Sequence, residues 1–115
     1  MSALPVRGSR ILVIGLAYKA GTSDWRESPS TRVITELLRL GADVRVHDNH
    51  VPPQAFAALG IDAAGCDTEE LTAADLVLLL VDHPDLPLDD ICDHARRVLD
   101  TKGTLRGRAF TGELL

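Results

Sequence analysis

The chain has 115 residues, a formal net charge of −5 and two cysteines. This length fits one domain, and a composition that is 45% hydrophobic but only 3% aromatic predicts an aliphatic core. The acidic balance argues against a nucleic acid or an anionic membrane as the partner of the whole surface. Cys66 and Cys92 form no CxxC pair, the start has no signal sequence, and no run approaches the ~18 apolar residues of a membrane span. We therefore expect a soluble, cytoplasmic protein.

The first predicted element is a strand over residues 10–14. Its unbroken, β-branched apolar run is typical of a strand that is buried on both faces. A long polar loop follows over residues 15–27, and Ser28 and Pro29 then predict a helix start with Ser28 as the cap. Open α/β folds bind ligands at such a place, beyond the carboxyl end of a strand and beside a helix N-terminus.

Strands and helices alternate along the rest of the chain. We expect helices over residues 29–40, 52–60, 68–73 and 88–98, and strands over 42–48, 61–63, 75–81 and 98–99. This alternation predicts a three-layer α/β/α, Rossmann-like parallel sheet with the strand order 3-2-1-4-5. The chain is predicted to be a single domain over residues 1–115, with a lead-in at 1–8 and a tail at 104–115 that shows no clear periodicity.

The loop over residues 15–27 carries both Lys19 and Arg26. Either side chain suits a phosphate or a carboxylate, Arg through its bidentate fork and Lys as a point charge. The loop lacks the three glycines of the dinucleotide-binding motif, because only Gly15 and Gly21 are present, and it has no Walker lysine. The pattern therefore favours recognition by side chains, with a merely solvated charged loop as the alternative.

Three other groups allow a chemical interpretation. Residues 47–50 read His-Asp-Asn-His, but this spacing is not that of a structural zinc site, so we expect no metal. Asp48 follows a predicted strand, where it could bind a ribose or simply end the strand. Asp82 and His83 follow the strongest apolar run, where they could be an acid–base pair or could order the loop.

Four segments of the chain match, in order, the motifs of a known family. They are GLAYK at residues 15–19 with Thr22, Asp24 and RESP at 26–29, then GADVRVHD at 41–48, AAD at 73–75 with the later Asp-His, and VLDTK at 98–102. The first segment resembles the GLAFKxxTxDxRESP signature of the UDP-glucose/GDP-mannose dehydrogenase family. The resemblance is to that family's C-terminal, UDP-binding domain, and it covers about residues 8–103.

The resemblance implies an activity that needs more than this chain. Members of the family oxidise the primary alcohol of a nucleotide sugar to a carboxylate in two NAD-dependent hydride transfers. They have an N-terminal NAD-binding domain and a central helical region with the catalytic cysteine. Neither the glycine motif nor the context of that cysteine occurs here. We therefore expect a UDP-sugar-binding domain that is inactive alone, with NAD held mainly by a domain absent from this chain. The expected partners are the UDP-sugar and the other two domains, and a homo-oligomer is left open.

The resemblance also implies roles for individual residues. Tyr18 and Lys19 are expected to contact the nucleotide sugar, and Arg26 to reach toward NAD. Lys102 stands where the family has a substrate-holding arginine. Because lysine lacks the bidentate fork of arginine, it would hold the substrate through charge alone.

The sequence leaves two points open. Arg106 or Arg108 could supply the guanidinium that Lys102 lacks. The alternative function is a free-standing Rossmann-like nucleotide-binding or protein-interaction module that has kept the fold and lost the chemistry.

Overall fold

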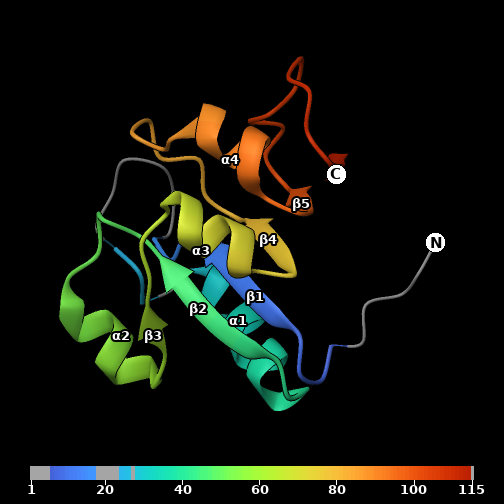
Figure 1. Ribbon diagram of the computed structural model, residues 1–115. Coiled ribbons are helices and arrows are strands. Elements are labelled where there is room, and N and C mark those ends of the chain that lie inside the picture. Colours follow the sequence, from blue (N-terminus) through green and yellow to red (C-terminus); the bar gives the residue numbers. More distant parts are fainter. Residues whose placement is uncertain (1–5, 18–23, 27, 115) are drawn as a thin grey trace.

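A computed structural model describes residues 6–17, 24–26 and 28–114 of the chain. In this described part, six parallel strands form one sheet in the order β3-β2-β1-β4-β5-β6 (Figure 1). The strands are β1 (Arg10–Ile14), β2 (Asp43–His47), β3 (Asp62–Ala63), β4 (Leu76–Leu79), β5 (Val98–Asp100) and β6 (Gly112–Leu114). The predicted fold class and the order of the first five strands are confirmed, and β6 extends the sheet beyond β5.

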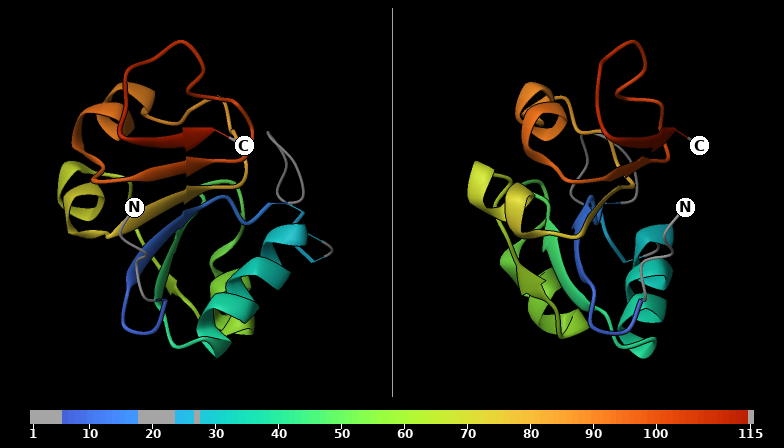
Figure 2. Two further views of the ribbon diagram at one scale, coloured as in Figure 1. Left: turned by 90° about the vertical axis from the view of Figure 1, so that its right-hand side faces the viewer. Right: turned by 45° about the vertical axis from the view of Figure 1, so that its right-hand side comes forward.

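The helices cover the two faces of this sheet. They are α1 (Pro29–Arg39), α2 (Pro53–Leu59), α3 (Thr68–Ala73) and α4 (Leu88–His94). α1 and α2 contribute to one buried cluster, and α3 and α4 to the other. In the right-hand view of Figure 2, α3 and α4 lie on one side of the strands and α1 on the other. None of the helices in the described ranges is long and apolar enough to cross a membrane.

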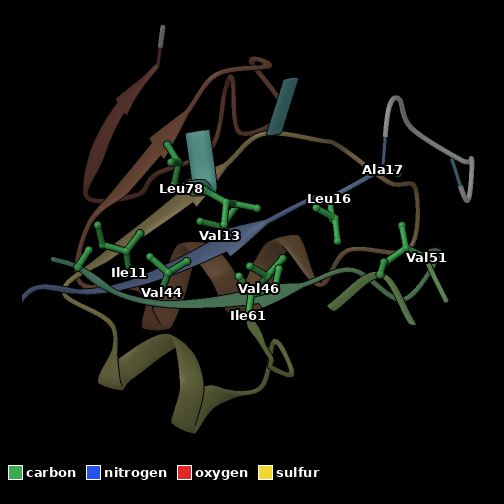
Figure 3. Close-up of a cluster of buried hydrophobic side chains, with 12 residues drawn as sticks. Ile11, Val13, Leu16, Ala17, Val44, Val46, Val51, Ile61 and Leu78 are labelled. Atoms are coloured by element: carbon green, nitrogen blue, oxygen red, sulfur yellow. The ribbon is translucent and has the colours of Figure 1, made fainter. Parts of the chain in front are cut away.

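The position of β1 in the sheet explains its unbroken apolar run, Ile11 to Ile14. Ile11 and Val13 belong to the cluster under α1 and α2, whereas Leu12 and Ile14 belong to the cluster under α3 and α4. Figure 3 shows the first of these clusters, where β1 meets side chains of the neighbouring strands, among them Val44, Val46 and Leu78. Because successive side chains of a strand point to opposite faces, only a strand covered on both sides needs every position apolar.

The start and end of α1 follow the prediction closely. The Ser28 side chain caps the helix by accepting a hydrogen bond from the Ser30 N–H at 3.1 Å, and Pro29 occupies the first turn. At the other end Leu40 is the C-cap, and Gly41 follows with φ +89°, a conformation that favours glycine. The helix therefore ends one residue earlier than predicted.

α4 is shorter than predicted, because it ends at His94 rather than at residue 98. Ala95 turns to an extended conformation with ψ 134°, and the Arg97 carbonyl accepts a hydrogen bond from Val77 N–H at 2.8 Å. The chain must leave the helix here to pair β5 with β4. Helical periodicity over residues 88–98 does not contain that information, since the competing partner lies in another strand.

The sequence predicts no element in the tail, whereas the structure places β6 there. A Cβ on Gly112 would come within 1.9 Å of the Val98 carbonyl oxygen, and the residue has φ +141°. Glycine is therefore required for the close pairing of β6 with β5. A three-residue strand is too short to show the alternation from which strands are predicted.

Candidate functional site

A cleft of about 190 Å³ opens at the carboxyl ends of β4 and β5, beside the N-terminus of α1. Its walls are Ser28, Pro29, Ser30, Val33, Leu80, Val81, Thr101 and Lys102. β1 pairs with β2 on one side and with β4 on the other, and the connections from these strands cover opposite faces of the sheet. The cleft therefore lies at the topological switch point, where open α/β sheets bind their ligands.

A buried carboxylate fixes the turn that carries Lys102. Asp100, at the end of β5, is 0% exposed. One of its oxygens accepts the Lys102 N–H at 2.9 Å, and the other accepts the Leu105 N–H at 2.7 Å. The Thr101 hydroxyl also donates to the Leu79 carbonyl at 2.8 Å. These bonds hold the backbone of the turn, while the Lys102 side chain stays exposed at the cleft.

The start of α1 contributes electrostatic potential to the cleft rather than free donors. Pro29 has no N–H, the Ser30 N–H bonds to the Ser28 hydroxyl, and the Thr31 N–H bonds to the Ser28 carbonyl. No acidic side chain lies in the first turn to offset the positive end of the helix dipole. An anion in the cleft would therefore be attracted by the dipole and would find its direct partner in Lys102, because the Ser28 and Thr101 hydroxyl groups already donate to the Ala17 and Leu79 carbonyls.

Arg26 lies in another hollow. This hollow, of about 360 Å³, is lined by Asp24, Trp25, Arg26 and Pro52. The guanidinium carbon of Arg26 is 6.0 Å from the centre of the Trp25 ring, and the backbone N–H of Arg26 donates to the Asp24 carboxylate at 3.3 Å. The structure thus separates Arg26 from the Lys102 cleft, although both residues are exposed. Tyr18 and Lys19, the other two predicted contacts, lie outside the described residues.

Asp48 is the second buried carboxylate at a strand end. Its Oδ2 accepts hydrogen bonds from the Leu16 and Ala17 N–H groups at 2.8 and 2.9 Å and from His83 Nε2 at 2.9 Å. Its Oδ1 accepts the His50 N–H at 2.8 Å. Burial raises the pKa of a carboxyl group, but these four donors together hold the pKa of Asp48 below its ordinary value. Asp48 and His83 therefore order the loops at this edge. For His83 this is one of the two interpretations that the sequence left open.

Asp48 is already engaged with protein donors, which leaves it poorly suited to a ribose. Its neighbour His47 turns away, because its Nδ1 bonds to the Ala64 carbonyl at 3.0 Å. Among the residues that the structure describes, no group of three or more histidine, cysteine, aspartate or glutamate side chains could hold a metal ion.

The structure distinguishes the two arginines that the sequence left open. Arg108 forms an ion pair with Asp89 and lines a hollow beside α4. The Arg106 guanidinium instead lies against the Lys102 turn, since its Nη2 would be 3.4 Å from a Cβ placed on Gly103. Arg106 therefore lies beside the Lys102 turn, although the walls of the cleft do not include it.

Comparison with known proteins identifies the family. Residues 12–107 match the UDP-glucose/GDP-mannose dehydrogenase family, UDP binding domain. The chain belongs to this family. The match includes both the cleft residues around Ser28 and the turn at Lys102, so the geometry described above is that of a UDP binding domain.

Three relatives place the domain within larger proteins. The full length of this chain is 30% identical to a UDP-N-acetyl-D-mannosamine dehydrogenase of Methanococcus maripaludis, and it covers 29% of that protein. It is 35% identical to a UDP-glucose dehydrogenase structure from Pyrobaculum islandicum, with a TM-score of 0.61 over 68% of this chain and 18% of that one. An NDP-N-acetyl-D-galactosaminuronic acid dehydrogenase structure from Methanosarcina mazei, 22% identical, shares the fold with a TM-score of 0.67 over 96% of this chain and 25% of its own. The UDP binding domain thus spans less than a third of these relatives.

Sequence reasoning missed the roles of the two strand-end carboxylates in the UDP binding domain. Asp48 directly follows β2 and Asp100 is the last residue of β5, and each accepts hydrogen bonds from the N–H groups of a loop. An aspartate at the carboxyl end of a strand was the available signal, and it occurs at both positions. Sequence alone could not give the partners, which for Asp48 lie 31 and 32 residues away.

Proposed function

We propose that this domain binds the UDP part of a UDP-sugar in the Lys102 cleft. The domain would serve an NAD-dependent nucleotide-sugar 6-dehydrogenase that oxidises UDP-glucose or a UDP-N-acetylhexosamine to the uronate. One observation carries the proposal. The cleft at the switch point combines the Lys102 ammonium group with the positive end of α1. This combination suits the pyrophosphate of a nucleotide sugar.

Tyr18 and Lys19 belong to the proposed site through their place in the chain. The loop that holds them follows Ala17 and precedes Ser28, and the Ser28 hydroxyl donates to the Ala17 carbonyl at 3.0 Å. Ser28 also lines the cleft. Both ends of the loop are therefore joined at the cleft wall, which supports a contact of Lys19 with phosphate or sugar oxygens and of Tyr18 with the base.

Arg26 is proposed to contact NAD held by another domain of the enzyme. Its guanidinium is exposed beside Trp25, and an exposed guanidinium fits a phosphate of the cofactor. NAD, when bound, takes up the hydride from the substrate alcohol. The UDP binding domain would hold the nucleotide of the substrate and close against the domain that holds NAD.

Binding of UDP to wild-type chain and to Lys102→Ala, measured by isothermal titration calorimetry, tests the proposal. Loss of one charge-assisted contact should weaken UDP binding about 10-fold or more. Arg39→Ala is the matched control, because it removes one exposed positive charge at the far end of α1. It should leave the affinity unchanged.

The choice of ligand sharpens this test. Lys102→Ala should impair UDP and UDP-glucose but not uridine, which has no phosphate for Lys102 to contact. If Lys102→Ala lowered the affinity for UDP and for uridine equally, Lys102 would lie outside the pyrophosphate site. No binding of UDP or UDP-glucose to the wild-type chain would instead favour a module that has kept the fold and lost the ligand.

A further inference from the structure

The loop that follows β1 is held near its start, at its second and third residues. Two successive N–H groups, of Leu16 and Ala17, point to one oxygen of Asp48, and both residues are fully buried. The carbonyl of Ala17 accepts a hydrogen bond from Ser28. The peptide groups on both sides of Ala17 are thus fixed, one by a carboxylate at the end of β2 and the other by the cap of α1.

Among the described residues that donate hydrogen bonds to Asp48, His83 is the one that donates from its side chain. The two side chains are 2% and 0% exposed, with 2.9 Å between His83 Nε2 and Asp48 Oδ2. Because an ionised carboxylate only accepts hydrogen bonds, Nε2 carries the hydrogen. Charge-assisted hydrogen bonds in such a dry place are stronger than neutral ones. His83 thereby fixes the oxygen to which Leu16 and Ala17 are bonded.

A second histidine, His50, packs against His83 on its solvent side. The rings of His50 and His83 stack with their centres 3.8 Å apart, and His50 Nε2 lies 2.8 Å from the Asp85 carboxylate. His50 follows β2 in the sequence, and His83 and Asp85 follow β4. The network therefore ties the loops after β1, β2 and β4 together at the carboxyl edge of the sheet.

We propose that Asp48 and His83 are positioning residues for nucleotide binding: they hold Leu16 and Ala17, whose carbonyl bonds to Ser28, in one fixed place at the wall of the Lys102 cleft. Neither side chain contacts the nucleotide. The inference rests on the proposed function, because it assigns the network a task in UDP binding as well as in folding.

The size of the effect follows from a population argument. The apparent affinity of a ligand falls in proportion to the fraction of protein in the competent conformation. If loss of the His83 donor lowers the fraction of protein with Leu16 and Ala17 anchored to about a tenth, UDP binds about 10-fold more weakly. A purely structural contact behaves differently. It lowers the unfolding temperature but leaves the affinity unchanged at temperatures where the whole chain is folded.

The test compares two replacements of His83 in the full chain, well below their unfolding temperatures. His83→Gln keeps an N–H that can reach Asp48, so UDP affinity should stay within about 3-fold of wild type. His83→Phe keeps a ring but no donor, so UDP affinity should fall about 10-fold or more. Asp48→Asn removes the charge and should act in the same direction as His83→Phe. Asp75→Asn is the matched control, since Asp75 accepts the Arg10 N–H at 2.9 Å at the opposite edge of the sheet, and it should not change UDP affinity.

Amide hydrogen exchange without any ligand separates this inference from the proposed function. The N–H groups of Leu16 and Ala17 should be protected in wild type and should exchange about 10-fold or more faster in folded His83→Phe. Unaltered UDP affinity in folded His83→Phe would overturn the positioning role while leaving UDP binding intact. Failure of wild type to bind UDP, with both amides protected, would overturn the proposed function and limit Asp48 and His83 to a structural role.

Discussion

Replacing Ser28 with alanine should destabilise the domain at the junction of the β1 loop and α1. The Ser28 hydroxyl accepts the Ser30 N–H at 3.1 Å and donates to the Ala17 carbonyl at 3.0 Å, and the residue is 2% exposed. Alanine removes both bonds at once. Glycine also removes both, but glycine at a helix N-cap costs only a few tenths of a kcal/mol relative to serine, so it isolates the bond to Ala17.

The two contributions can be sized separately. Loss of a serine N-cap costs about 1 kcal/mol. Leaving the buried Ala17 carbonyl without its partner costs about 1–3 kcal/mol. Ser28→Ala should therefore lower the free energy of unfolding by about 2–4 kcal/mol. The thermal unfolding midpoint of a chain of this size shifts by about 4 °C per kcal/mol, so it should fall by roughly 8–16 °C.

Urea and thermal unfolding followed by circular dichroism would measure these values. Ser28→Gly should be destabilised by about 1–3 kcal/mol, less than Ser28→Ala. Thr35→Ala is the control, because it removes an exposed hydroxyl from the same helix and should stay within about 0.5 kcal/mol of wild type. If Ser28→Ala also stayed within that range, the described bonds would not be what joins the loop to the helix.

Two further predictions concern Gly15 and Cys66. Gly15→Ala should cost at least about 2 kcal/mol in urea unfolding, because a Cβ would lie 2.6 Å from the Val81 backbone nitrogen and φ is +110°; a smaller loss would mean that Val81 can move aside. Burial, aided by the nearby Asp67 and Asp90 carboxylates, raises the pKa of Cys66 from 9.0 to about 12. The folded chain therefore favours the neutral thiol, and this contribution to stability is present below pH 9 and is lost as the pH rises through the window from 9 to 12. Cys66 should react slowly with a thiol reagent at pH 8 until urea unfolds the chain, and equal rates in both states would contradict the buried thiol.

The amino-acid sequence alone determined the elements whose signals lie within a few neighbouring residues. Neighbouring residues are enough to predict three of these features: the apolar run of β1, the Ser28 cap with Pro29, and Gly41 after α1. The order of the first five strands followed from the alternation of elements and the handedness of their connections. The family signature likewise lies within one stretch of chain, so it can be recognised without the tertiary structure.

Only the tertiary structure decided what depends on partners distant in the sequence. The end of α4 and the presence of β6 are set by pairing with β4 and β5. The separation of Arg26 from the Lys102 cleft is likewise visible only once the chain is folded. The role of Asp48 comes from N–H groups 31 and 32 residues before it and from a histidine 35 residues after it. The role of a buried carboxylate depends on the hydrogen-bond donors that folding brings close to it. The residues next to Asp48 in the sequence do not predict these distant donors.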